Sequence, residues 1–205
     1  MYYTGKRAAE YEDQRKGDPK WDFERKTLKT ILEPLKIKSV LDIAVGTGRF
    51  FDLYPSHITG VDCSPDMLAI AKKRAPHAVL KLCDLLVDPL PATADLVVCF
   101  RFLNLISTKH ALSMLDDLLA ASRKYAVFTM RTLPDTSISL GRVTVHPLGD
   151  VLSVIAGAGF KVVEVYPYED NVDGVYAVYF CQKLPKPRKP RNASSDIPDD
   201  DTQSD

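Results

Sequence analysis

The chain has 205 residues, which suits one α/β domain and is too short for two full-sized ones. It is 45% hydrophobic and 26% charged, the mix of a soluble globular protein with a sizeable core. Lysine plus arginine and aspartate plus glutamate number 27 each, so the formal net charge is zero. A zero net charge disfavours a protein held on nucleic acid or on an anionic membrane by bulk charge.

Cysteine usage and the N-terminus set the expected compartment. The four cysteines form no Cys-x-x-Cys pair and lie in apolar runs. This disfavours a disulfide scaffold and a cysteine metal site, so we predict no metal and a reducing, cytoplasmic compartment. The charged N-terminus lacks the apolar stretch of a secretory signal, and the longest apolar runs have the length of strands. We therefore predict no membrane association.

The C-terminal segment differs in composition from the rest of the chain. Residues 183–191 carry five basic residues and no acid, and residues 196–205 carry five acids and no base. Such a segment cannot bury enough apolar surface to offset the entropy of ordering, so we predict a disordered tail over 183–205. The tail is either a docking or nucleic-acid arm or a solubilising segment whose halves neutralise each other, and its balanced charge favours the second.

The body of the chain alternates helix and strand patterns. Trp21, Leu28, Leu32 and Leu35 recur at helical spacing, and Ser64-Pro65 is a typical helix start. This alternation predicts a mainly parallel sheet with helices on both faces. The expected strands are 39–43, 58–62, 78–82, 95–100, 125–130, 161–165 and 175–180; further helices are expected from about 49, from 64, over 108–122 and over 148–155, the last ended by Gly159.

The loop after the first strand contains Gly46 and Gly48. Ligands of such sheets bind beyond the carboxyl ends of the strands, so this loop is a candidate site. Position 51 is Phe, so the G-x-G-x-x-G pattern of dinucleotide binding is incomplete. Asp42 at the strand end would repel a pyrophosphate and attract a ligand that carries an ammonium and a sulfonium group. The alternative is a tight strand–helix turn without a ligand.

The loops after the next strands also carry acids. Asp62 ends the second strand and can accept hydrogen bonds from both hydroxyls of a ribose; the alternative is a helix N-cap, a role that Ser64 fills better. Asp84 follows the third strand and can accept from the exocyclic amine of an adenine, with Leu85 as an apolar wall. The alternative for Asp84 is a solvated loop acid.

The fourth strand leads directly into Phe100 and Arg101, with Asn104 at the rim. Because an unpaired buried arginine is costly, Arg101 should face the cleft or an acid. We therefore expect Phe100 and Arg101 beside the reactive end of a ligand. A structural salt bridge is the alternative for Arg101.

Together these segments resemble a class I S-adenosylmethionine-dependent methyltransferase, over about residues 10–182. The segments that carry the resemblance are VLDIAVGTGRF, GVDCSPDMLAIAKKRA, KLCDLLVDPLP and DLVVCFRFLNLI. Within this family the chain is most similar to the branch related to the ubiquinone and menaquinone biosynthesis enzymes. Ala44 departs from the pattern, since many members have glycine there. The resemblance implies a Rossmann-like seven-stranded sheet of order 3-2-1-4-5-7-6, with strand seven antiparallel.

The resemblance also implies roles for individual residues and for segments. An N-terminal lid would cover 1–20, the methyltransferase domain 21–182 and the tail 183–205. Tyr11 and Arg15 in the lid, together with Asn104, would contact the substrate. The residues expected to hold S-adenosylmethionine are Asp42, Ala44, Gly46 and Gly48 at the methionine, Asp62, Cys63 and Met67 at the adenosine, Asp84 and Leu85 at the adenine, and Phe100 and Arg101 near the methyl group.

The expected reaction is in-line methyl transfer, in which orientation alone can be worth ~7–11 kcal/mol. His146, expected in a loop after the fifth strand, is the candidate general base; alternatively, it only begins the next helix with Pro147. No Asn-Pro-Pro-Tyr follows the fourth strand, no cysteine pair suggests covalent base methylation, and no nucleic-acid domain is evident. A small molecule or a protein side chain remains as the acceptor. A non-catalytic cofactor-binding partner subunit and, less favoured, a nicotinamide-dependent oxidoreductase are the alternatives.

Overall fold

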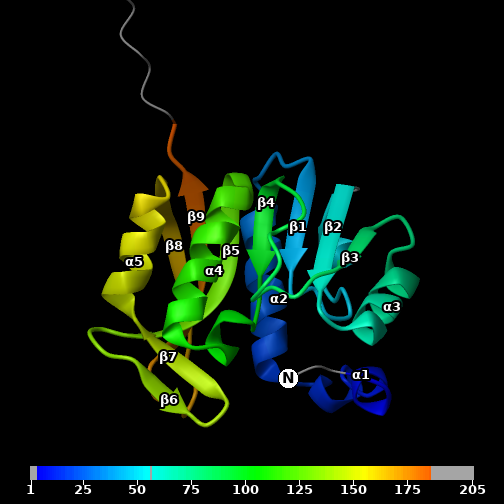
Figure 1. Ribbon diagram of the computed structural model, residues 1–205, viewed down its shortest axis with the longest axis horizontal. Helices are drawn as coiled ribbons and strands as arrows, with labels where there is room; N and C mark the ends of the chain where they lie inside the picture. Colours follow the sequence, from blue (N-terminus) through cyan, green and yellow to red (C-terminus); the bar gives the residue numbers. More distant parts are fainter. Residues whose placement is uncertain (1–3, 56, 186–205) are drawn as a thin grey trace, which may run out of the picture.

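The computed structural model describes residues 4–55 and 57–185 (Figure 1). Its helices are α1 (Lys6–Ala9), α2 (Pro19–Leu32), α3 (Pro65–Arg74), α4 (Thr108–Ala121) and α5 (Leu148–Gly157), with single 3₁₀ turns η1 (Asp13–Arg15), η2 (Phe51–Leu53) and η3 (Leu103–Leu105). Its strands are β1 (Ser39–Ile43), β2 (His57–Asp62), β3 (Val79–Leu82), β4 (Ala94–Cys99), β5 (Ser122–Leu133), β6 (Ile138–Leu140), β7 (Val143–Pro147), β8 (Phe160–Tyr168) and β9 (Val175–Lys183).

The main sheet has the predicted topology. β3, β2, β1, β4 and β5 pair in this order, all in parallel. β9 then pairs antiparallel with β5, and β8 pairs antiparallel with β9. When β8 and β9 are counted as strands six and seven, this is the expected order 3-2-1-4-5-7-6, so the predicted α/β fold class is confirmed.

An inserted hairpin is the first departure from the prediction. β6 and β7 pair antiparallel, and β7 continues the sheet through the pairs Thr132↔His146 and Leu133↔Pro147 at the end of β5. The described part of the chain therefore has nine strands rather than seven. We expected a loop before α5, which was wrong. Gly141, at φ 65°, provides the left-handed turn between the two short strands.

The segment after the glycine loop is the second departure. A helix was expected from about Arg49, but the structure has only the 3₁₀ turn η2. Pro55 disfavours helical backbone at the preceding residue, and Tyr54 is extended at φ −92°, ψ 155°. With β2 beginning at His57, too little chain remains for an α-helix. As a result, the loop, η2 and α2 lie close together.

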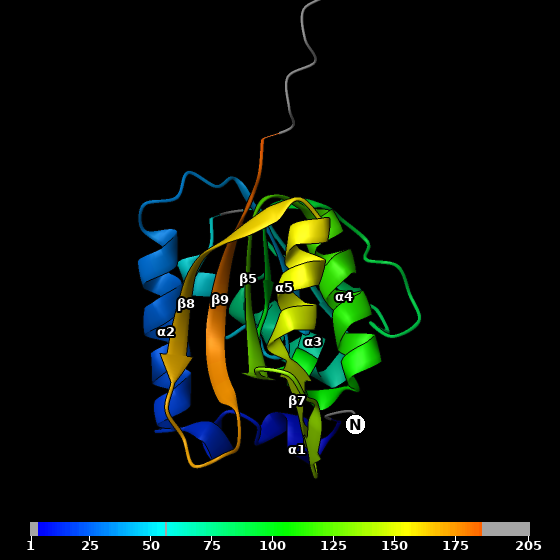
Figure 2. The ribbon, with the colours of Figure 1, turned by 90° about the vertical axis from the view of Figure 1, so that its left-hand side faces the viewer.

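Helices cover both faces of the sheet, as Figure 2 shows: α2 lies on one side of β5 and β9, and α4 and α5 lie on the other. The core under α4 and α5 includes Leu115, Leu118 and Phe128, all fully buried. The core under α2 includes Leu28, Leu96 and Val127. The sheet is therefore buried on both faces, which fits the apolar runs of its central strands.

The carboxyl ends of the parallel strands define one edge of the molecule. β1, β2 and β4 point towards the edge at which α1 and the N-terminal segment lie (Figure 1). β9 runs the other way, so the described chain ends at the opposite edge (Figure 1). The predicted tail falls mostly on 186–205, outside the described residues. In the described ranges, no helix is long and apolar enough to cross a membrane.

Candidate active site

The loop after β1 turns through three residues with positive φ. Ala44, Gly46 and Gly48 have φ of 55°, 56° and 69°. A Cβ on Gly46 would meet no atom within 4 Å, whereas one on Gly48 would lie 2.5 Å from the ring of Phe51. Gly48 is thus required by packing, and Gly46 leaves open space above its backbone. Ala44 adopts a left-handed conformation that normally favours glycine.

Asp62 connects the end of β2 to this loop. Its Oδ2 accepts a hydrogen bond from the Gly46 backbone N–H at 2.9 Å, and its Oδ1 accepts from the Ser64 N–H at 2.9 Å. Ser64 caps α3 by accepting from the Met67 N–H at 3.2 Å, as predicted. Burial raises the pKa of Asp62, and the backbone donors oppose that rise. The carboxylate is therefore held at the loop rather than used as a helix cap.

Asp42 lies within β1 and is only 5% exposed. The hydroxyl of Tyr54 donates to its Oδ2 at 2.9 Å. Burial raises the pKa of Asp42 to about 7; the Tyr54 hydrogen bond and the charge of Arg49 work against that rise. A cation placed near Asp42 would stabilise its charged form. Tyr54 is a site residue that the sequence analysis did not identify.

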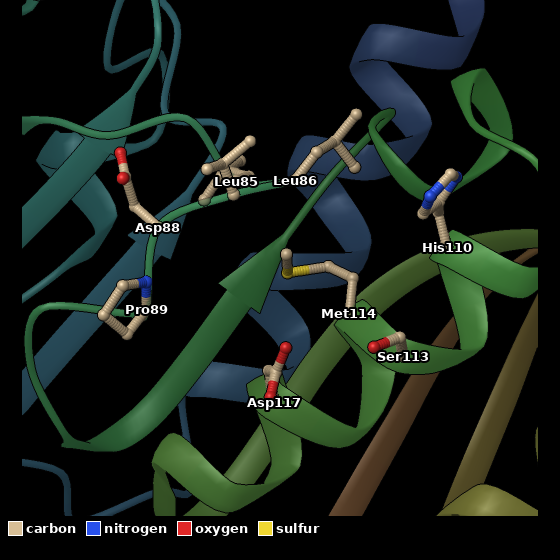
Figure 3. A pocket seen from close by; sticks show the side chains of 9 residues that line it. Leu85, Leu86, Asp88, Pro89, His110, Ser113, Met114 and Asp117 are labelled. Atoms are coloured by element: carbon tan, nitrogen blue, oxygen red, sulfur yellow. The ribbon is translucent and has the colours of Figure 1, made fainter.

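The segment after β3 borders a pocket of about 290 Å³ (Figure 3). Residues 85–89 form one wall and α4 forms the other, with Leu85 itself 6% exposed. Asp84 Oδ1 accepts from the Leu86 N–H at 3.1 Å, so this carboxylate shapes its own loop. Cys63, partly buried, and Met67, buried, lie at the neighbouring end of β2 and the start of α3.

The N-terminal segment lies against the glycine loop and α3. The Thr47 hydroxyl donates to Glu12 Oε1 at 2.5 Å, and Arg74 forms an ion pair with Glu12 at 2.7 Å. The Gly5 N–H donates to Asp66 at 2.7 Å. The lid role of this segment stays a prediction, and Glu12, which makes the contact with the loop, was not among the predicted residues.

Of the predicted lid residues, Tyr11 contacts both Arg15 and Trp21. The Arg15 guanidinium lies 3.8 Å from the centroid of the Tyr11 ring, and the Tyr11 and Trp21 ring centroids are 5.9 Å apart. These contacts place Tyr11 beside the start of α2, with Arg15 stacked on its ring. Their expected contact with a substrate stays a prediction.

A polar cluster lies under the start of α2. Glu24, fully buried on α2, accepts from Arg101 Nε at 2.7 Å, from Arg49 Nη2 at 2.5 Å and from the Tyr176 hydroxyl. Arg101 also pairs through Nη1 with Asp18 at 3.1 Å. Arg101 has φ 59°, so a strained backbone is kept in place by these partners. Arg101 thus forms structural salt bridges, the alternative considered from the sequence, through Nε and Nη1 but not through Nη2.

Glu24 could have been found from the sequence. It shares the apolar stripe of α2 with Trp21 and Leu28, at spacings of three and four residues. A charged residue on a buried helix face needs a partner. Two of the three partners of Glu24 lie next to predicted site positions: Arg49 follows the glycine loop, and Arg101 follows the end of β4. The sequence does not reveal those partners, because Arg101 and Tyr176 are 77 and 152 residues away.

Two other predicted residues point into the protein interior. Asn104 is 5% exposed, and its Oδ1 accepts from the Arg131 N–H at 2.6 Å. Phe100 is 7% exposed, and its ring packs edge-on against Phe50 with centroids 4.9 Å apart. Asn104 thus ties η3 to β5, and Phe100 fills the core under α2.

His146 is fully buried on β7, not in a loop. Its Nε2 lies 3.1 Å from the Leu103 carbonyl, which can only accept, so Nε2 carries the proton. Its Nδ1 accepts from the Thr108 hydroxyl at 3.1 Å. Both nitrogens are engaged, and burial lowers the pKa of the imidazole. This placement leaves no free nitrogen for a general base and favours a structural role, joining β7 to η3 and α4.

Comparisons with known proteins agree with this arrangement. Residues 40–124 match a family model described as a methyltransferase domain. No match was found among curated protein sequences. In the part of the chain that the structure describes, no group of three or more His, Cys, Asp or Glu side chains could hold a metal ion.

The chain is also similar to solved methyltransferase structures. Magnesium protoporphyrin IX methyltransferase from Synechocystis PCC 6803, with S-adenosylhomocysteine bound, has 16% identity and a TM-score of 0.64, over 78% of this chain and 84% of that one. An amino pentose methyltransferase from Micromonospora echinaspora has 18% identity and a TM-score of 0.64, over 85% and 96%. An S-adenosylmethionine-dependent methyltransferase from Clostridium acetobutylicum has 13% identity and a TM-score of 0.63, over 86% and 97%.

The matched segment contains the glycine loop, Asp62, Asp84 and Arg101. It also spans the strands whose carboxyl ends carry the candidate site. Residues 40–124 therefore resemble a methyltransferase domain, and the chain has the fold of these S-adenosylmethionine-dependent enzymes.

Proposed function

We propose that this chain catalyses methyl transfer from S-adenosylmethionine to a small molecule. The observation that carries the proposal is the joined pair of the glycine loop and Asp62, inside the segment that matches a methyltransferase domain. The solved structures that resemble this chain include enzymes named for a porphyrin and for an amino pentose, which supports a small acceptor. The branch related to ubiquinone and menaquinone enzymes stays a prediction.

The residues present fit the methyl donor. The space above Gly46 is free of side chains, and Asp62 carries a carboxylate directly beside it. Asp42, with its pKa near 7, can take up charge when a cation approaches. Leu85 borders a pocket of about 290 Å³, and Asp84 directly precedes it in the chain. A pyrophosphate-containing dinucleotide fits less well, because two carboxylates would face its phosphates.

In this proposal each element has one task. Asp62 would hold the ribose, Asp42 would face the cationic end, and Leu85 would cover the adenine. When bound, S-adenosylmethionine supplies an activated methyl group on a sulfonium. The chain then needs to orient the acceptor and exclude water, and the N-terminal segment that Glu12 ties to Thr47 would close the site. The contacts of His146 do not support a base role, so we propose no protein base.

The compartment is also part of the proposal. Cys63, Cys83, Cys99 and Cys181 are all free thiols, which supports a reducing, cytoplasmic compartment. We propose a protein that works on a freely diffusing acceptor, without nucleic acid or membrane.

The proposal is tested by adding the purified protein and methyl-labelled S-adenosylmethionine to a lysate of the source organism, which is then separated into small molecules, protein and nucleic acid. We expect label in the small-molecule fraction, and much less with Asp62→Ala as the matched control. Label in protein or nucleic acid would contradict the small acceptor. Donor binding without label in any fraction would favour the alternative, a non-catalytic binding subunit.

A further inference from the structure

Two N–H donors in the polar cluster have no acceptor. Trp21 Nε1 and Arg101 Nη2 are buried and find no hydrogen-bond partner among the described residues. The Arg101 guanidinium lies 6.0 Å from the centroid of the Trp21 ring. Buried donors are nearly always paired in folded proteins. Two unpaired donors in neighbouring side chains therefore point to an acceptor group that binds between them.

The cluster around these donors also carries one positive charge in excess. The polar cluster consists of Tyr176, whose hydroxyl donates to Glu24, and of the charged side chains that are joined by ion pairs around it. Its four cations outnumber its three acids, and every acid is paired. The cations are Lys20, Arg49, Arg101 and Arg131, and the acids are Asp18, Glu24 and Asp170.

The position of the cluster separates it from the predicted adenosine contacts. Arg101 follows β4, and its backbone N–H donates to Thr129 on β5 at 2.7 Å, while Tyr176 belongs to β9. Asp62 and Asp84, by contrast, follow β2 and β3 on the other side of β1. The cluster is thus on the half of the edge that a methyl acceptor would approach while the adenosine occupies the other half.

A pocket borders the cluster on the side of Trp21 and Arg49. Trp21 and Arg49 are both in the wall of a pocket of about 410 Å³ between α2, η2 and the end of α3. The Arg49 guanidinium lies 4.7 Å from the centroid of the Trp21 ring. The wall of this pocket carries three arginines and three acids, so the excess charge belongs to the cluster and not to the pocket.

We infer that the methyl acceptor carries a carboxylate, and that Trp21 Nε1 and Arg101 Nη2 bind it. A carboxylate has two oxygens, one for each free donor, and its charge balances the excess of the cluster. A neutral acceptor could satisfy the donors, but without a negative charge it would form weaker hydrogen bonds with them. This inference rests on the proposed function, because it assigns the cluster to the acceptor of that reaction.

The test uses calorimetric titration of the full-length protein with two probes that differ only in charge at one group, benzoate and benzamide. The protein is first saturated with S-adenosylhomocysteine. We expect benzoate to bind this complex at least ten-fold more tightly than benzamide. Trp21 is the only tryptophan of the chain, so its fluorescence should change with benzoate and report binding next to the cluster.

Two variants locate the binding. Trp21→Phe keeps an aromatic ring but loses the Nε1 donor, and we expect benzoate affinity to fall about ten-fold, the usual effect of one hydrogen bond to a charged group. Arg101→Lys keeps the charge but loses the free Nη2, and we expect a similar fall. Arg123→Lys is the matched control, because Arg123 pairs with Asp95 away from the cluster and should leave benzoate affinity unchanged.

Each failure has its own meaning. Equal affinity for benzoate and benzamide, or unchanged benzoate affinity in both cluster variants, would overturn the inference while S-adenosylhomocysteine binding still supports the proposed function. Competition between benzoate and S-adenosylhomocysteine would also overturn it, because the cluster would then hold the carboxylate of the donor itself. No binding of S-adenosylhomocysteine would contradict the proposed function.

Discussion

At the scale of single residues, Ala44 keeps a backbone conformation that normally favours glycine. Left-handed backbone costs an alanine ~1–2 kcal/mol, which a substitution by glycine would relieve. Part of this relief is offset, because glycine increases the conformational entropy of the unfolded chain. We therefore expect Ala44→Gly, at φ 55°, to stabilise the protein by about 0.5–1 kcal/mol. The measurement is a thermal or urea unfolding curve.

The control for Ala44→Gly is Ala69→Gly in the middle of α3, an exposed position in regular helix. This change should destabilise the protein by roughly 1 kcal/mol, since glycine is the poorer helix former. If both substitutions destabilise to the same extent, the strain at Ala44 is not real.

Asp42 makes the unfolding free energy depend on pH in an unusual direction. Its pKa is raised to about 7 by burial, so between pH 4 and 7 the unfolded chain loses this proton while the folded one keeps it. The contribution of Asp42 to stability therefore falls as pH rises through this window. We expect Asp42→Asn to be more stable than the wild type at pH 8 and to lose this advantage at pH 4.

The unfolding free energies of both proteins, measured in urea at several pH values, test this. Asp52→Asn is the opposite control, because the Arg25 ion pair lowers the pKa of Asp52. Its wild-type contribution should be present above pH 4 and lost on acidification. A difference between the wild type and Asp42→Asn that does not vary with pH would contradict the buried, protonated state of Asp42.

At the scale of elements, His146 holds the inserted hairpin to the rest of the domain. Burial lowers the pKa of His146, so below its ordinary pKa of about 6.5 the unfolded chain gains a proton that the folded chain resists. Its stabilising contribution is present above that pH and is lost on acidification. We expect His146→Gln to cost ~1–3 kcal/mol at pH 8, and the cost to shrink below pH 6.5.

Unfolding curves of the wild type and His146→Gln between pH 5 and 8 measure that difference. The same substitution at the exposed His77 should change stability at pH 8 by less than about 0.5 kcal/mol. An exposed, catalytic His146 would behave like His77, with little effect on unfolding.

The two misjudged elements show which local signals decide a prediction. The parallel strands were readable because their apolar runs are short and bounded by turn residues, and Gly159 ends α5 at φ 77° as expected. The helix after Gly48 was wrong because Pro55 shortens the available chain. The hairpin was not predicted because the alternating segments on either side of Gly141, Ile138–Leu140 and residues 143–145, are too short to give a clear strand pattern.

The sequence predicted those site residues that lie at or directly after the ends of parallel strands. Asp42, Gly46, Gly48 and Asp62 are brought together, because neighbouring parallel strands end at one edge. The partners of these residues were not predictable. Packing between different segments of the chain brings Tyr54, Glu12 and Glu24 to the site. Such contacts cannot be predicted from residue spacing or composition.

At the scale of the whole molecule, the described chain ends at the edge opposite the site. The last backbone hydrogen bond is from the Leu184 N–H to the Gly159 carbonyl at 2.8 Å. We expect removal of residues 186–205 to leave the melting temperature and the affinity for S-adenosylhomocysteine unchanged. Removal of residues 180–205 is the contrasting control, because it deletes the end of β9 and its pairs with β5 and β8.

Thermal melts of the two truncated proteins make this comparison. The longer truncation should lower the melting temperature strongly, since β9 is paired on both sides. If the shorter truncation has a comparable effect, the C-terminal segment contributes to the folded domain.

The central claim is that the glycine loop and the two strand-end acids bind the donor of a methyl group. Calorimetric titration with S-adenosylhomocysteine tests it most directly, with NAD as the competing ligand and Asp62→Ala as the variant. We predict that S-adenosylhomocysteine binds, that NAD does not, and that Asp62→Ala weakens binding by ~1–3 kcal/mol, because a charged acceptor is lost. Binding of NAD without S-adenosylhomocysteine, or unchanged affinity in Asp62→Ala, would contradict the account.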